Sequence, residues 1–208
     1  MKIKLDRKYL QYSIFVSLIL VISYVLFATV FSFTTKKAQS SLPPVLAASD
    51  CLPAFRDGGG PYYQANAPFR ENIAPDSTTG EKLYMEGYIY NSTCTNTIAH
   101  ATLDIWQASE EGTYEDEYYR GQVTTDENGY YKFESVIPLG YGEGTAYRPP
   151  HIHFKVHIDG EEVVTSQMFF EDVRGRQGFN DEYIIDLEQN ANAWNGTHNI
   201  IIPDIKFN

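Results

Sequence analysis

Residues 121–134, GQVTTDENGYYKFE, form two short alternating runs on either side of a turn signal. The runs 121–125 and 130–134 carry β-branched or aromatic side chains at alternate positions, which is typical of half-buried strands. Between them, Asp126-Glu127-Asn128-Gly129 supplies the polar residues and the glycine that a reverse turn with positive φ requires. We therefore expect a β-hairpin here and an all-β fold around it.

The same alternation of short runs and turn signals recurs along the rest of the chain. Asp159-Gly160 predicts a second hairpin turn, and neither a convincing helical period nor an internal repeat follows residue 40. The sequence thus predicts an all-β fold, a β-sandwich of mostly antiparallel strands, preceded by one N-terminal hydrophobic helix. The expected strands are 82–90, 97–107, 121–125, 130–134, 151–158, 162–170, 183–187 and 199–205.

Length and charge limit the classes of function. With 208 residues the chain has room for one ordinary domain, and 43% hydrophobic residues with 14% aromatics argue against disorder. Six of the 16 Lys and Arg, but one of the 27 Asp and Glu, lie in residues 1–40, so residues 41–208 carry 10 bases, 26 acids and a net charge of −16. A surface this acidic repels phosphate backbones, which disfavours nucleic acid as a partner.

The amino-terminal segment is directed to a membrane. No charged residue lies between Tyr9 and Thr35, and the apolar stretch 13–33 is long enough to cross a hydrocarbon layer of about 30 Å. Four bases precede it and two follow, which predicts that residues 1–12 are cytoplasmic and that the body lies outside the cytoplasm. Residues 13–33 are either an uncleaved signal anchor or a cleaved signal peptide. Residues 34–50 are then a linker and 51–208 the folded domain, membrane-anchored or secreted.

The two cysteines, Cys51 and Cys94, both fall in the exported part. An oxidising compartment allows them to form a disulfide, which would tie the start of the domain to a later strand. The alternative is two free thiols, since no CxxC spacing suggests a metal site.

Two histidines carry the clearest chemical signal. On a strand, His151 and His153 project from the same face, and imidazoles side by side are ready metal ligands, although satisfied surface histidines remain the alternative. His157 shares that face but lies too far along the strand to join them. A cupin-type site needs a Glu closer than Glu161, and no Cys is near.

Tyrosines are the remaining donors near these histidines. Tyr114 and Tyr141 both lie on turns that flank predicted strands. A tyrosine is protonated at its usual pKa near 10, so it coordinates only a strongly Lewis-acidic cation such as ferric iron.

At this point the chain resembles the intradiol ring-cleavage dioxygenases of the catechol and protocatechuate type, over almost the whole body. The order and spacing of a series of motifs carry the resemblance, whereas the TDxxGxYxF element alone also occurs in transthyretin-like sandwiches. The matching segments are 60–63 (GPYY), 67–73 (APFRENI), 103–108 (LDIWQA), 112–114 (GTY), 120–121 (RG), 125–133 (TDENGYYKF), 137–141 (IPLGY), 148–154 (RPPHIHF) and 165–170 (TSQMFF).

The resemblance implies a function and a site. It makes Tyr114, Tyr141, His151 and His153 the ligands of one non-haem Fe(III) per chain, with Tyr141 also accepting a substrate proton. It places Arg148 over the bound substrate. The implied reaction inserts O2 into a catechol-type ring, cleaving it between the two hydroxylated carbons to give a cis,cis-muconate-type diacid.

Neighbouring residues complete this expectation. Tyr147 is expected to line the substrate pocket beside Arg148, and Trp106 and Arg120 to support the site. Tyr118 and Tyr119 are the rivals of Tyr114 as a ligand, and Tyr147 is the rival of Tyr141.

Two other functions stay open on the sequence alone. One is a non-catalytic, transthyretin-like extracellular binding sandwich, and the other a cupin-like divalent-metal enzyme. The chain lacks the long helical amino-terminal region of cytosolic catechol dioxygenases, so it is more similar to the short, exported branch of the family. A homodimer is one possible assembly, and the sequence does not indicate which catechol is the substrate.

Overall fold

A computed structural model of the chain describes residues 21, 23, 43–170, 183–190 and 192–204. Contacts divide the chain into two units, Met1–Ser41 and Leu42–Asn208. In the first unit, the described residues Val21 and Ser23 are helical, and the rest of the predicted segment 13–33 lies outside the described residues. Among the residues that the structure describes, no helix is long and apolar enough to cross a bilayer.

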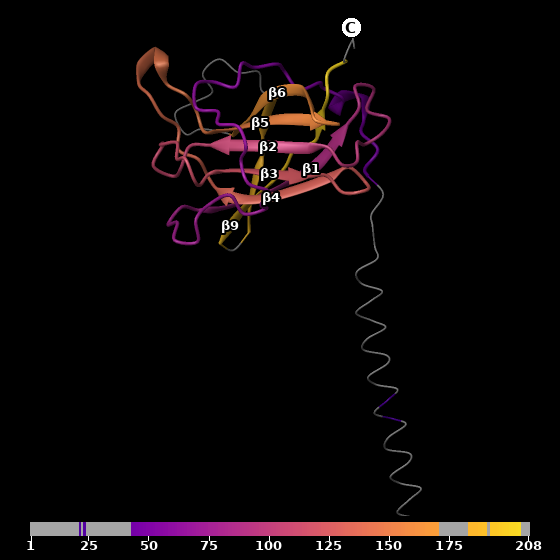
Figure 1. Cartoon of the computed structure of the whole chain (residues 1–208), viewed down its shortest axis with the longest axis horizontal. Coiled ribbons are helices and arrows are strands. Elements are labelled where there is room, and N and C mark those ends of the chain that lie inside the picture. The colour runs from indigo at the N-terminus through magenta and orange to yellow at the C-terminus, as the bar shows by residue number, and fades with distance from the viewer. Residues whose placement is uncertain (1–20, 22, 24–42, 171–182, 191, 205–208) are drawn as a thin grey trace, which may run out of the picture. The chain divides into compact units, whose positions relative to one another are not determined.

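The second unit consists of two five-stranded sheets (Figure 1). In the first sheet β1 is central, pairing antiparallel with β4 and parallel with β9 and β10, while β8 pairs with β9. The strands of this sheet are β1 (Lys82–Tyr90), β4 (Tyr130–Val136), β8 (Leu187–Asn190), β9 (Ala193–Thr197) and β10 (Ile200–Ile201).

The second sheet has the order β3-β2-β5-β6-β7, antiparallel except for the β6–β7 pair. Its strands are β2 (Thr102–Gln107), β3 (Arg120–Thr124), β5 (His151–Ile158), β6 (Glu161–Phe170) and β7 (Ile184–Ile185). Two short 3-10 helices, η1 (Ala48–Asp50) and η2 (Gly144–Ala146), lie in the connections. The predicted all-β fold with mostly antiparallel pairing is confirmed for this unit.

The hydrophobic core lies between the sheets. Leu83 and Phe133 of the first sheet and Ile105, Phe154 and Met168 of the second belong to one buried cluster. On β5, Ile152, Phe154 and Val156 face this core, so the alternate residues lie on the other face of the second sheet. The site described below is built on that outer face.

The predicted hairpin at 126–129 is wrong. The turn itself is present, with Gly129 at φ 75° and its N–H donating to the Asp126 carbonyl at 2.9 Å. However, β3 pairs with β2 and β4 pairs with β1, so the turn carries the chain from one sheet to the other. The reason is core packing, because Val123 and Phe133 thereby reach the same buried cluster from opposite sheets. The second predicted turn, Asp159-Gly160, does join the hairpin β5–β6.

Other boundaries also differ from the prediction. Residues 97–101 are not a strand, since His100 adopts φ 58° and its N–H donates to the Thr125 carbonyl. The expected strand 183–187 is divided at Asp186. Within the described part of the expected strand 199–205, residues 199–204, only β10 is a strand. β9 was not predicted, because AWNGT has no apolar alternation and becomes a strand by pairing with β1.

The predicted disulfide is confirmed. Cys51 and Cys94 are bonded, with their Cα atoms 5.9 Å apart and a separation of 43 positions in sequence. The bridge fixes the start of the body to the loop that follows β1.

Candidate metal centre

The two histidines meet at the start of β5, on the outer face of the second sheet. His151 and His153 are both buried, and their Nε2 atoms lie 3.1 Å apart. Burial lowers the pKa of His151 to about 4 and that of His153 to about 3, so both imidazoles are neutral near pH 7. The structure thus brings together the two nitrogens that the i, i+2 spacing predicted. His157 is opposite Glu162 near the other end of the strand and does not join them.

The two rings are held in different ways. His151 Nδ1 lies 2.6 Å from the Pro149 carbonyl, which can only accept, so Nδ1 carries the proton and Nε2 offers its lone pair. The ring of His153 instead stacks on Trp106, with centroids 4.9 Å apart and planes 1° apart. The expected supporting role of Trp106 is therefore a direct contact with the histidine.

Tyr114 lies in the loop between β2 and β3, and its hydroxyl reaches the histidines. Its Oη lies 3.4 Å from His151 Nε2 and 3.4 Å from Tyr141 Oη. Gly112, at φ 78°, makes the turn before it, and a side chain there would pack against Tyr141. Burial raises the pKa of Tyr114 well above 10, with the Tyr141 hydroxyl acting in the same direction. The phenol therefore stays protonated unless a strong Lewis acid replaces the proton.

Tyr141 is fixed by a pair of backbone hydrogen bonds with Arg148. The Tyr141 N–H donates to the Arg148 carbonyl at 3.0 Å, and the Arg148 N–H donates back at 2.7 Å. The hydroxyl of Tyr147 lies against Gly140, where a Cβ would collide with it. This contact explains the glycine in IPLGY.

The four predicted ligand residues thus form one group. Donor atoms that share a metal ion at about 2.0–2.1 Å are roughly 2.8–3.4 Å apart, and the three separations above are 3.1–3.4 Å. Within the described residues, no set of three or more His, Cys, Asp or Glu could hold a metal ion. The cupin-like alternative, which requires a carboxylate beside the two imidazoles, therefore lacks its ligand set there. A donor set of two phenols and two neutral imidazoles fits a trivalent cation, because two phenolates supply two negative charges.

Arg148 lies beside the group. Its positive charge favours lower pKa values for His151, His153 and Tyr114, although burial has the larger effect on all three. Its Nη2 donates to Gln167 Oε1 at 2.8 Å. Arg120 donates to the carbonyls of Gln64, Ala65 and Asp116 and so fastens the surrounding loops together.

The rivals of Tyr114 lie elsewhere. Tyr119 is buried and donates to Glu110 at 2.7 Å, and the ring of Tyr118 lies under the Arg70 guanidinium. Sequence reasoning had assigned no role to Tyr62, whose ring stacks on Tyr114 with centroids 4.2 Å apart. Its place in the GPYY motif was the signal that could have drawn attention to it.

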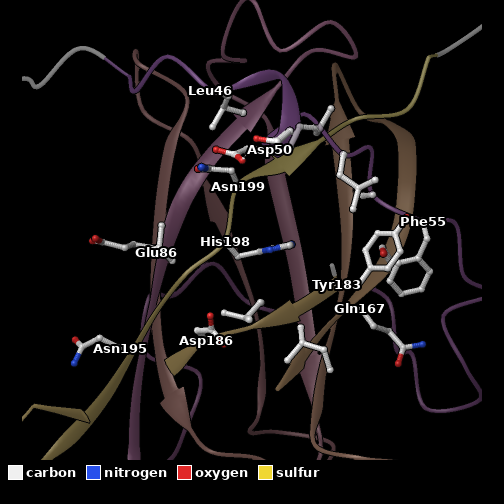
Figure 2. A pocket seen from close by; sticks show the side chains of 18 of the residues that line it. Leu46, Asp50, Phe55, Glu86, Gln167, Tyr183, Asp186, Asn195, His198 and Asn199 are labelled. Atoms are coloured by element: carbon white, nitrogen blue, oxygen red, sulfur yellow. Dashed lines mark hydrogen bonds between the residues drawn. The ribbon is translucent and has the colours of Figure 1, made fainter. Parts of the chain in front are cut away.

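A separate cavity of about 850 Å³ opens near η1, β1 and β10 (Figure 2). Asp50, Glu86, Asp186 and His198 are among the residues that line it. Gln167 also lines it and accepts a hydrogen bond from Arg148. None of the four donor residues lines this cavity.

Comparisons with known proteins identify similar sequences and folds. A family model described as "Dioxygenase" matches residues 59–190. The chlorocatechol 1,2-dioxygenase of Pseudomonas putida is 30% identical over 135 residues, which are 54% of this chain and 52% of that protein. An intradiol ring-cleavage dioxygenase of Aspergillus niger is also 30% identical over 135 residues, covering 53% of this chain and 43% of that protein.

The chain belongs to the intradiol ring-cleavage dioxygenase family. Another similar member, the catechol 1,2-dioxygenase of Pseudomonas sp. (strain EST1001), is 33% identical over 147 residues, 55% of this chain and 48% of that protein. The chain spans about half the length of the curated relatives that it matches.

Solved structures support the same fold for this family member. The dioxygenase domain of a carbohydrate-binding fusion protein from Streptomyces sp. SirexAA-E superposes with a TM-score of 0.62 at 24% identity, covering 73% of this chain and 99% of that one. An intradiol ring-cleavage dioxygenase from Tetranychus urticae gives 0.62 at 23% identity, covering 74% and 95%.

Proposed function

We propose that the protein is a non-haem Fe(III) dioxygenase that inserts O2 into a catechol-type ring and cleaves it between the two hydroxylated carbons. The product is a cis,cis-muconate-type diacid. The observation that carries the proposal is the convergence of Tyr114, Tyr141, His151 and His153, with donor separations of 3.1–3.4 Å. Membership of the intradiol family and its curated catechol 1,2-dioxygenase relatives support it.

One Fe(III) per chain would be held by these four side chains. When bound, it supplies Lewis acidity for binding the substrate diol and the electronic link between the aromatic ring and O2. The residues themselves prepare the site. The Pro149 carbonyl fixes the tautomer of His151, and burial keeps both imidazoles neutral and available.

Binding a catechol as its dianion requires the removal of two hydroxyl protons. We assign one of them to Tyr141, whose Oη would be a phenolate while it holds the metal ion and becomes a neutral phenol, and the other to solvent. The backbone of Tyr141 is held by two hydrogen bonds with Arg148. The phenol can therefore leave the metal ion by rotating about its own side-chain torsions while the backbone stays in place.

Arg148 supplies a fixed positive charge for the anionic substrate. It touches the bound ring and stabilises the negative charge that develops on it, as preorganised cations do in sites that exclude water. Tyr147, on the same loop, lines the substrate position. A small aromatic diol and O2 are therefore the partners we propose.

We further propose that the body works outside the cytoplasm, either anchored by residues 13–33 or released after cleavage of that segment. The Cys51–Cys94 disulfide supports this location, since disulfides persist in oxidising compartments. Protease added to intact cells should digest the body, and protection of the body would contradict the proposal.

The function is tested on the full-length chain, purified in detergent and loaded with iron. We expect a wine-red protein that consumes O2 with catechol and releases a ring-opened diacid. A folded, iron-reconstituted chain that stays colourless would overturn the proposal. Chlorocatechol, protocatechuate and hydroxyquinol, assayed side by side with catechol, would then identify the preferred ring.

Tyr141→Phe is the sharper variant. It removes one phenolate, so part of the colour should disappear and turnover should slow. An unchanged spectrum would show that Tyr141 is not a ligand.

A further inference from the structure

Arg148 is held by a chain of two hydrogen bonds that ends on a carboxylate. The guanidinium donates to Gln167 Oε1 at 2.8 Å, and Gln167 Nε2 donates to Asp57 Oδ2. A guanidinium can only donate and an ionised carboxylate can only accept, so this pair of neighbours permits one orientation of the Gln167 amide. Gln167 itself is buried.

Asp57 is fixed at both of its carboxylate oxygens. Oδ2 accepts from Gln167, and Oδ1 accepts from the Gly58 N–H at 2.8 Å. Its own N–H donates to the Thr165 carbonyl at 2.9 Å, which aligns it with β6 two residues before Gln167. The carboxylate is therefore presented by a segment whose backbone is tied to the strand that carries Gln167.

This segment is anchored outside the region that the family model matches. The match begins at residue 59, whereas Asp57 precedes it. Upstream, the Ala54 N–H donates to the Ile201 carbonyl at 2.9 Å, and Cys51 is bonded to Cys94. Phe55 stacks on Phe169, with centroids 5.9 Å apart. The amino-terminal segment of the body thus contacts the site through the Asp57 carboxylate, which accepts from Gln167.

We propose that Asp57 is a positioning residue for Arg148 and acts through Gln167. The proposal rests on the proposed function, in which Arg148 stabilises the anionic substrate. Without Asp57, the Gln167 amide can turn and present its NH2 group to the guanidinium, which is a contact of two donors. Arg148 then loses its acceptor, and a long side chain regains rotamers in which its charge no longer faces the substrate.

The first experiment measures the hydrogen bond without any turnover. In the metal-free full-length chain, the side-chain amide protons of Gln167 are identified by NMR from their loss in Gln167→Ala. They should exchange slowly with solvent in the wild type and at least about 10-fold faster in Asp57→Ala. Fast exchange in the wild type, or no acceleration in the variant, overturns the proposal whether or not the protein is an active dioxygenase.

The second experiment is a double-mutant cycle on the iron-loaded chain. Asp57→Ala and Gln167→Ala should each lower kcat for catechol by about 10- to 100-fold, with a smaller change in KM and unchanged iron content and colour. If Asp57 acts through Gln167, the double variant is no slower than Gln167→Ala alone. If the losses in kcat of the two single variants multiply in the double variant, Asp57 does not act through Gln167 and the proposal is overturned.

Two further variants separate positioning from other causes. Asp57→Asn keeps one acceptor oxygen without the charge, so it should retain more activity than Asp57→Ala. Asp50→Ala is the matched control, because Asp50 lies on the same segment and its carboxylate accepts from Ser49. It should keep wild-type kcat, and a loss equal to that of Asp57→Ala would overturn the assignment. Failure of the wild type to cleave catechol contradicts the proposed function, while the exchange experiment still decides the role of Asp57.

Discussion

The ring of Trp106 lies parallel to that of His153, at 4.9 Å between centroids and 1° between planes. His153 Nδ1 and Trp106 Nε1 are the buried side-chain polar atoms without a hydrogen-bond partner among the described residues. His151 has the Pro149 carbonyl to orient it, so the two imidazoles differ in what holds them. Stacking on Trp106 orients the ring of His153, as the hydrogen bond to Pro149 orients that of His151.

Trp106→Leu should therefore weaken iron binding. Loss of the stacked surface lets His153 rotate, and contacts that orient a metal ligand are typically worth about 10- to 100-fold in metal affinity. Iron retention against a chelator measures the effect. Trp194→Leu is the control, since Trp194 lies on β9 in the other sheet. Equal retention in both variants would contradict the supporting role of Trp106.

Tyr114→Phe should cost at least about 10-fold in iron affinity and remove part of the visible absorption, because it deletes one phenolate of the donor set. Tyr118→Phe is the matched comparison: its ring packs under Arg70 and should tolerate the loss of the hydroxyl. Titration with Fe(III) followed by absorbance distinguishes them. A colour change in Tyr118→Phe alone would move the ligand assignment to the rival tyrosine.

Acid should destabilise the metal-free protein. Burial lowers the pKa values of His151, His153 and His198 to about 4, 3 and 4, whereas unfolded histidines titrate near 6.5. The unfolded chain therefore binds more protons below pH 6.5, and stability falls as the pH decreases from 6.5 towards 4. Each such histidine contributes a slope of up to about 1.4 kcal/mol per pH unit.

Thermal unfolding of the metal-free chain between pH 7 and 4.5 measures this slope. His198→Gln should flatten the dependence, because it removes one half-buried group whose pKa is lowered to about 4. A slope that is the same in the wild type and in His198→Gln would show that His198 does not control it.

Reduction of the disulfide should destabilise the body. The bridge joins residues 43 apart, and loops of this size are usually worth roughly 2–4 kcal/mol. Denaturant unfolding of Cys51→Ser/Cys94→Ser against the oxidised wild type measures the loss. Equal midpoints for the two proteins would exclude a stabilising role.

Some parts of the fold were readable because they depend on local pattern. The strands 82–90 and 151–158 were predicted with their observed bounds, as both alternate apolar side chains towards the core. Residues 121–134 were read correctly as strand, turn and strand, yet the two strands belong to different sheets. A turn sequence specifies the local backbone, and the partner of each strand is chosen by contacts distant in sequence.

The site divides in the same way. The pairing of His151 and His153 follows from strand geometry, while the two tyrosines were selected by resemblance to a known family. No local pattern indicated Asp57 or its bond to Gln167, because 110 residues separate them in sequence.

By itself, the sequence determined an all-β body and a pair of imidazoles on one strand face, since these depend on alternation and spacing, while it left the state of the two cysteines open. The tertiary structure decided that Tyr114 and Tyr141 meet those imidazoles, that Trp106 stacks on His153 and that Asp57 accepts a hydrogen bond from Gln167. The physical reason is that such contacts form between loops and strands distant in the chain, where packing of the two sheets sets which side chains come within bonding distance.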